Sequence, residues 1–237
     1  MRIHLLNGRV NLETTPTVPN PSEDAAWLAA ALPNSGTSYF EAGLGTGAAS
    51  FCLLARLPQA KVTGLELQPE MIAAASHNLT LNPLANHRLE IVAGNITTFT
   101  PPEPFEHSFA NLPYYQPEDG FKSQHPVRDK AHGLGETKLV DWFAGLKRTT
   151  RPDGTITCIG HIQQLDDFCA FFKNATLHII ELRTHATRPA KRAIMQAHLS
   201  GPAARHDYIA ENFNPALRQA ILQQAESLFD HLRLTTQ

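Results

Sequence analysis

Residues 38–47 read Ser-Tyr-Phe-Glu-Ala-Gly-Leu-Gly-Thr-Gly, an apolar run that ends in an acidic residue and three alternating glycines. The apolar run predicts a buried strand, and the glycines predict a tight turn from that strand into a helix. Glycine adopts unusual φ angles and has no side chain, so the backbone of such a turn can approach a ligand closely. The stretch therefore predicts a ligand-binding strand–turn–helix unit with Gly43, Gly45 and Gly47 at its bend.

Strand and helix patterns alternate on both sides of this unit. Strands are expected near 37–42, 61–66, 88–93, 106–111, 155–160, 176–184 and 191–198. Helices are expected near 46–57, 69–80, 136–149 and 162–173. This alternation predicts an α/β fold with a doubly wound, mostly parallel, seven-stranded sheet and helices on both faces. Ligands of such sheets bind beyond the carboxyl ends of the strands.

We expect a single domain over residues 1–237, because no internal repeat divides the sequence. Its two terminal segments are expected to differ from the alternating pattern. An irregular N-terminal arm is expected over about 1–21, followed by a helix with Ser22 as its N-cap. Residues from about 215 to 233 carry apolar side chains at helical spacing and predict a C-terminal amphipathic helix.

The composition limits the possible partners. Twenty Lys and Arg residues against 22 Asp and Glu residues give a net charge of −2, which argues against a uniformly basic nucleic-acid binder. There is no apolar run of membrane-spanning length, and the first residues are too polar for a secretion signal, so we expect a cytoplasmic protein. The twelve His and three Cys residues show no metal-ligand spacing, so we expect no metal.

A nucleoside-binding site is expected where the first strands end. Glu41 ends the first expected strand and Glu66 ends the second, where a carboxylate can accept the ribose hydroxyls of a nucleoside. Asn95 follows the third strand, where its side-chain amide could meet an adenine edge. A nicotinamide dinucleotide and a purely structural turn stay open as alternatives, although the third glycine is not at the offset of the dinucleotide fingerprint.

A second motif, Asn111-Leu112-Pro113-Tyr114, ends the fourth expected strand. An adenine amino group is a poor nucleophile because its lone pair is delocalised into the ring. A side-chain oxygen such as that of Asn111 can hold one of its hydrogens, and an aromatic ring such as that of Tyr114 can stack on the base. An ordinary strand end followed by a Pro-Tyr turn is the alternative interpretation.

Both motifs resemble those of known enzymes. Residues 41–47 resemble motif I of the class I S-adenosylmethionine-dependent methyltransferases, which are Rossmann-like. Residues 111–114 resemble the Asn/Asp/Ser-Pro-Pro-Tyr/Phe motif of amino-methyltransferases, with Leu112 at the second position. The resemblance implies S-adenosylmethionine as cofactor. It also implies a catalytic site of Asn111, Tyr114 and Pro113, whose backbone carbonyl would accept the second amino hydrogen.

Further stretches resemble the group around the bacterial valine-tRNA adenine-N6 methyltransferases, namely residues 24–30, 131–133 and 185–192. That group methylates an exocyclic adenine nitrogen in a tRNA anticodon loop. The resemblance implies an N-methyltransferase that acts on structured RNA, most naturally tRNA. Residues 183–206 contain five Lys and Arg but no Asp or Glu, and within them Arg188, Lys191 and Arg192 are expected to contact RNA phosphates.

Several other substrates fit the same residues. The amide of a protein glutamine presents the same flat NH2 group, and would make the basic segment unnecessary. DNA adenine and a small molecule are also possible acceptors, and so is a non-catalytic protein that binds RNA or cofactor with this fold. The Asn-Leu-Pro-Tyr motif argues against the non-catalytic alternative.

Overall fold

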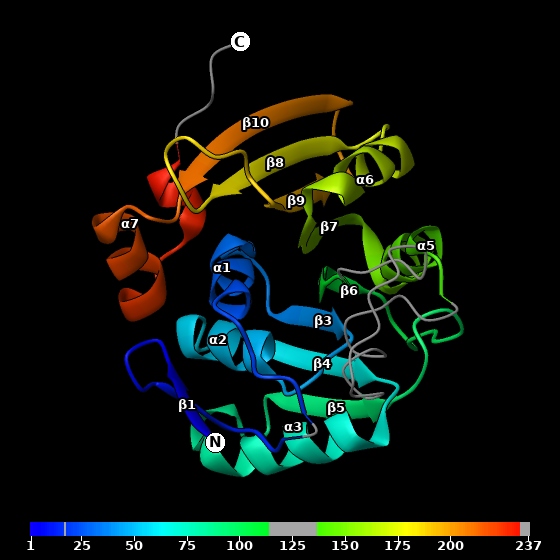
Figure 1. Cartoon of the computed structure of the whole chain (residues 1–237). Coiled ribbons are helices and arrows are strands. Elements are labelled where there is room, and N and C mark those ends of the chain that lie inside the picture. The colour runs from blue at the N-terminus through cyan, green and yellow to red at the C-terminus, as the bar shows by residue number, and fades with distance from the viewer. Residues whose placement is uncertain (17, 114–136, 233–237) are drawn as a thin grey trace.

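The computed structural model describes residues 1–16, 18–113 and 137–232, and its centre is an eight-stranded sheet of order β10-β8-β9-β7-β6-β3-β4-β5. Figure 1 shows these strands in sequence from β10 at the top to β5 at the bottom. The strands are β3 (Ser38–Ala42), β4 (Lys61–Glu66), β5 (Leu89–Ala93), β6 (Phe105–Asn111), β7 (Thr150–His161), β8 (Thr176–Arg183), β9 (Arg192–His198) and β10 (Ala204–Glu211).

The sheet is mostly parallel, as the sequence predicts. Only β9 runs antiparallel to its neighbours β7 and β8, so the carboxyl ends of the other seven strands lie along one edge. The expected number of seven strands is wrong, because β10 adds an eighth at the border of the sheet. Its sequence is polar, and Arg205 pairs with Asp207 along it, so no apolar run marks it as a strand.

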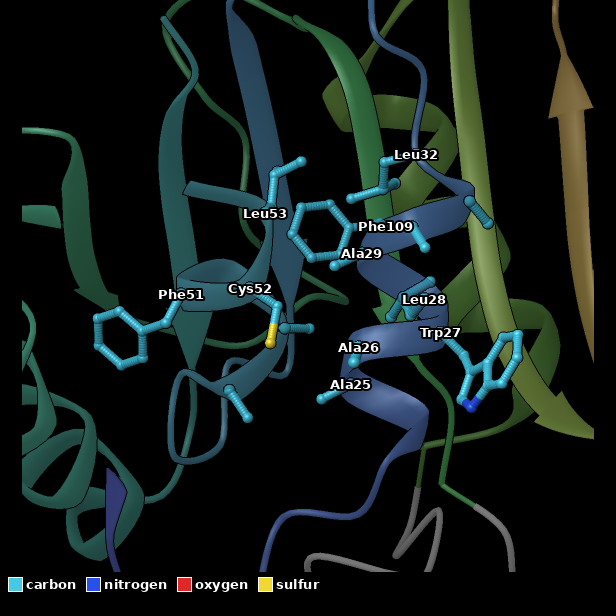
Figure 2. Close-up of a cluster of buried hydrophobic side chains, with 14 of the residues drawn as sticks. Ala25, Ala26, Trp27, Leu28, Ala29, Leu32, Phe51, Cys52, Leu53 and Phe109 are labelled. Carbon is cyan, nitrogen blue, oxygen red and sulfur yellow. The ribbon is translucent and has the colours of Figure 1, made fainter. Parts of the chain in front are cut away.

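Helices cover both faces of the sheet. They are α1 (Asp24–Ala31), α2 (Ala48–Arg56), α3 (Pro69–Leu81), α5 (Leu139–Thr149), α6 (Leu165–Phe171) and the short α7 (Pro215–Gln219). Successive residues of a strand point to opposite faces of the sheet and so belong to two different hydrophobic cores. Phe109 packs with α1 and α2, whereas Ala110 packs with α5 and α6. Figure 2 shows the side chains of α1 facing those of α2, with Phe109 in the same cluster.

The N-terminal segment is more regular than expected. Strands β1 (Arg2–Leu5) and β2 (Val10–Glu13) form an antiparallel hairpin, so the predicted irregular arm is wrong over these residues. The turn between them has positive φ at Leu6, Asn7 and Gly8. Helix α1 begins at Asp24 with Glu23 at its N-cap position, while the Ser22 hydroxyl accepts a bond from the Asp24 amide at 3.3 Å.

The C-terminal segment is less regular than expected. Helix α7 gives way to a π-helical turn at Ala220–Gln224, and Ala225 then adopts a left-handed conformation that ends it. The chain continues into a 3-10 turn at Leu228–His231, so one continuous helix over 215–233 is wrong. Periodicity alone predicted this helix, and burial of Ile221 and Leu228 satisfies the apolar pattern without it. Within the described ranges, no helix has the length and apolar character needed to cross a membrane.

Candidate active site

A cavity of about 390 Å³ opens at the carboxyl ends of β3 and β6. Strands β3 and β6 are neighbours with Ala42 opposite Ala110, so Gly43, which follows β3, and Asn111, which ends β6, lie next to each other at the sheet edge. Both line the cavity. The other lining residues are Pro19, Asn20, Pro21, Ser22, Asp24, Ala25, Glu41, Leu44, Gly45, Thr46, Ala48, Ala49, Met71, Leu112 and Arg192.

The three glycines of the turn differ in the space beside their backbone. A Cβ atom built on Gly43 would lie 2.9 Å from the Trp142 ring, and one built on Gly47 would lie 2.6 Å from the Phe51 ring. At Gly45, which has a φ of +57°, nothing lies within 4 Å of such an atom. Gly43 and Gly47 are therefore required by neighbouring rings as well as by their φ angles, whereas Gly45 presents bare backbone to a ligand.

Glu41 places a buried carboxyl group in the cavity wall. The Ser50 hydroxyl donates a hydrogen bond to Glu41 Oε2. The pKa of Glu41 is raised to about 8, chiefly by burial and also by the nearby charge of Glu66, while the hydrogen bonds from Ser50 oppose the rise. The carboxyl group is thus largely protonated at neutral pH, and a cation in the cavity would favour its ionised form.

Glu66 holds the glycine turn rather than facing the cavity directly. Its Oε2 accepts from the Gly45 amide at 2.8 Å, and its Oε1 accepts from the amides of Leu67 and Gln68 at 2.8 and 2.9 Å. An ionised carboxylate has about four lone-pair sites, so these three bonds leave capacity for one further donor. Leu67 beside it is 61% exposed, an apolar surface that the sequence patterns did not single out.

Asn95 follows β5 and is half-buried. Its Oδ1 accepts from both the amide and the hydroxyl of Thr97, each at 2.9 Å. The carbonyl end of the side chain is therefore used within its own turn. Of the expected cofactor residues, Glu41, Gly43 and Gly45 line the cavity, whereas Gly47, Glu66 and Asn95 do not.

The Asn-Leu-Pro segment is fixed from the neighbouring strand. The Leu112 amide donates to the Ile159 carbonyl at 2.8 Å, and the Pro113 carbonyl accepts from Gln164 Nε2 at 2.8 Å. Asn111 and Leu112 line the cavity, whereas Pro113 is buried and does not. Tyr114 and residues 131–133 lie outside the described residues. Gln164 was missed in the sequence because nothing marks its contact with a motif 51 residues earlier.

The three residues expected to contact RNA do not lie together: one lines the cavity and the other two are on an exposed connection. Arg192 lines the cavity and forms an ion pair with Asp24, whose side chain is only 4% exposed. Asp24 also accepts from the Ser22 hydroxyl at 3.0 Å. Arg188 and Lys191 are exposed on the connection between β8 and β9. Across the described chain, no group of three His, Cys, Asp or Glu side chains is arranged to hold a metal ion.

Comparisons with known proteins find methyltransferases. The family model described as a methyltransferase domain matches residues 40–123, which contain both motifs. Over 169 residues the chain is 28% identical to the tRNA1(Val) (adenine(37)-N6)-methyltransferase of Vibrio cholerae, covering 70% of this chain and 69% of that one. These likenesses support a class I S-adenosylmethionine-dependent methyltransferase. A second methyltransferase of the same name, from Shewanella sp. strain W3-18-1, is 27% identical over 177 residues and 73% of each chain.

Solved structures of methyltransferases show the same fold as this chain. A predicted O-methyltransferase from Agrobacterium tumefaciens superposes with a TM-score of 0.65 at 22% identity, over 82% of this chain and 93% of that one. A type I restriction-modification methyltransferase subunit from Streptococcus thermophilus gives 0.56 at 11% identity, over 85% and 48%. The expected α/β fold is thereby confirmed.

The family and the fold confirm S-adenosylmethionine as the cofactor. The residues present fit this group. The bare backbone at Gly45 accommodates close approach, and the Glu41 carboxyl suits a positively charged ligand.

Proposed function

We propose that this methyltransferase transfers a methyl group to an exocyclic adenine amino nitrogen of structured RNA, with tRNA as the substrate, in the cytoplasm. The observation that carries the proposal is that Asn111 and the glycine turn line one cavity. The names of the relatives from Vibrio and Shewanella, which specify a tRNA adenine, support the same substrate class.

The cofactor would be held by the turn and by the two acidic residues. Gly43 and Gly45 supply backbone, Glu66 uses its remaining acceptor site for a ribose hydroxyl, and Leu67 offers an apolar surface to the base beside it. Because Asn95 Oδ1 is engaged by Thr97, its side-chain NH2 is the group that would meet an adenine ring nitrogen. When bound, S-adenosylmethionine supplies an electrophilic methyl group on a positively charged sulfur.

The acceptor amino group would be held by the motif at the end of β6. The Asn111 side-chain oxygen accepts one hydrogen and thereby aims the nitrogen lone pair into the cavity. We assign the second acceptor to the Leu112 carbonyl, because Leu112 lines the cavity while the Pro113 carbonyl already accepts from buried Gln164. Tyr114 is proposed to stack on the base. Positioning of this kind, rather than a strong base, supplies the rate enhancement.

The test is methyl transfer by the purified protein with radiolabelled S-adenosylmethionine. Unmodified tRNA, ribosomal RNA, DNA and protein are compared as acceptors, and the labelled nucleoside is identified by mass spectrometry. We expect N6-methyladenosine in tRNA. Label in protein glutamine instead of RNA would overturn the substrate class.

The catalytic assignment is tested with Asn111→Ala. We expect turnover to fall by at least about 100-fold, because the variant loses the acceptor that orients the nucleophile, while cofactor affinity stays unchanged. Asn174→Ala is the matched control, since Asn174 is exposed just before β8, at the opposite edge of the sheet. Unaltered turnover in Asn111→Ala would remove Asn111 from the proposed role.

A further inference from the structure

A second cavity of about 400 Å³ adjoins the candidate active site. Asp24 and Arg192 line both cavities, so their ion pair stands at the junction between the two. The second cavity lies among α1, the residues that follow β8 and the turn that follows β10. It therefore sits at the same carboxyl edge of the sheet as Asn111.

Two aromatic residues form part of its wall. Phe213, in the turn after β10, is 37% exposed, a high value for a phenylalanine side chain. Trp27 is 1% exposed, and its indole Nε1 has no hydrogen-bond partner in the described part of the chain. Figure 2 shows the Trp27 indole on the side of α1 away from α2. A buried N–H donor without a partner is costly, and its position in this wall points to an acceptor-bearing ligand.

The charges in the wall favour a phosphate at the junction. The Arg192 side chain is 46% exposed although its partner Asp24 is buried, so part of this cationic side chain stays accessible at the junction of the two cavities. Arg218, which also lines this cavity, pairs with Glu23 at 2.6 Å.

We propose that the second cavity binds the unpaired nucleotide adjacent to the target adenosine, with its base against Phe213, and that Arg192 contacts the phosphate joining the two nucleotides. The inference rests on the proposed RNA function. Two consecutive nucleotides in adjoining cavities share one phosphodiester, and that group must pass the junction where Arg192 stands. Stacking of splayed bases on aromatic side chains is the usual way in which proteins bind unpaired RNA.

The test uses the full-length protein loaded with S-adenosylmethionine and an RNA stem-loop that carries the target adenosine. We expect Phe213→Ala to lower kcat/KM by about 10-fold and Phe213→Tyr to restore most of it, since tyrosine keeps the stacking face. For the unaltered protein, an RNA with an abasic site at one of the two positions beside the target should show a similar fall in kcat/KM. For Phe213→Ala, the same abasic RNA should be methylated no more slowly than intact RNA, because the substitution and the abasic site remove the same interaction.

Leu84→Ala is the control for loss of an exposed apolar side chain, since Leu84 is 74% exposed beside α3 and remote from both cavities. The proposal is overturned if Phe213→Ala methylates intact RNA like the unaltered protein, if it loses cofactor affinity, or if its defect adds to that of each abasic site. These outcomes differ from failure of the proposed function, in which the unaltered protein itself transfers no methyl group to RNA.

Discussion

Gln164 donates its side-chain amide to the Pro113 carbonyl at 2.8 Å and accepts the His161 amide at 2.9 Å. The side chain is 4% exposed, so both bonds are shielded from water. A Cβ atom on Gly160 would lie 2.3 Å from Gln164 Oε1, and the glycine therefore leaves the space that the amide occupies. Through this bridge the end of β7 fixes the backbone of the motif that ends β6.

Replacing the donor of this bridge makes methyl transfer depend on pH. In Gln164→Glu the ionised carboxylate repels the Pro113 carbonyl, whereas the protonated acid donates to it. We expect kcat to fall by about 10- to 100-fold at pH 8 with a smaller change in KM, and the ratio of variant to unaltered activity to rise as the pH is lowered. Single-turnover rates of the variant and the unaltered protein between about pH 6.5 and about pH 8.5, above the range in which His178 titrates, measure this.

Gln163→Glu is the matched control, because Gln163 is exposed in the same turn. It introduces the same charge one residue away without touching the motif. If the two variants show the same pH dependence, the bridge has no role in orienting the site.

The fold could be predicted wherever a pattern is local. The apolar run before Glu41 and the alternation of strands with helices correctly indicate a parallel sheet. The sequence did not predict strand β10 or the break at Ala225. A polar strand at the border of a sheet and a residue in the left-handed conformation both depend on tertiary packing. The hairpin β1–β2 was missed although Asn7-Gly8 is a common turn signal.

The candidate site could be predicted only as far as its motifs reach. Register brings Gly43 and Asn111 together, as parallel strand ends require. Gln164 and Trp142 come from elements after the motifs, and no spacing rule links them to the cavity. The ion pair between Arg192 and Asp24 could not be predicted either, because the two residues are 168 positions apart in the sequence.

Cofactor affinity should increase with pH through the titration of Glu41. Burial holds its pKa near 8, and a positively charged ligand in the same cavity favours the carboxylate. Affinity therefore rises as the pH increases from 6.5 towards 8.5 (about the span of that titration), and Glu41→Gln flattens this rise. Calorimetry in buffers of different ionisation enthalpy should detect proton release on binding. Glu90→Gln, an exposed carboxyl on β5, should keep both effects, and a pH-independent affinity in the unaltered protein would refute the assignment.

Acid should destabilise the border of the sheet at His178. Burial, together with the neighbouring rings of His198 and His206, lowers the pKa of His178 to about 4. Its Nδ1 lies 3.0 Å from the Tyr208 hydroxyl. The folded pKa lies below the unfolded value, so the stabilisation is complete above about pH 6.5 and is lost as the pH falls toward 4.

His178→Phe should reduce this acid sensitivity. The loss is on the order of 1–2 kcal/mol, less than full linkage because the ring is only partly buried. Urea unfolding at pH 7 and pH 4.5 (inside the titration window) measures it. His185→Phe, at an exposed histidine, should behave like the unaltered protein, and equal acid sensitivity in both variants would contradict the assignment.

The exposed cations between β8 and β9 should govern the salt dependence of RNA binding. Arg188→Ala/Lys191→Ala removes two phosphate contacts and should lower the magnitude of the slope of log K against log salt by about 1.5. The effect should be the same for RNAs of different sequence, because phosphate contacts do not read bases. Filter binding from low to moderate salt measures the slope. Exposed Lys173, after α6 at the opposite edge, gives the control Lys173→Ala, and an unchanged slope in the double variant would exclude these contacts.

Trp142 should report cofactor binding by fluorescence. Its ring lies 2.9 Å from where a Gly43 Cβ would stand, whereas Trp27, the other tryptophan, lines the second cavity. A cofactor held by the glycine turn changes the surroundings of Trp142 more than those of Trp27. We therefore expect the emission change on titration with S-adenosylmethionine to persist in Trp27→Phe and to be largely lost in Trp142→Phe, with similar affinity by calorimetry. An emission change that is lost in Trp27→Phe and kept in Trp142→Phe would place the cofactor in the second cavity. The roles proposed for the two cavities would then be exchanged.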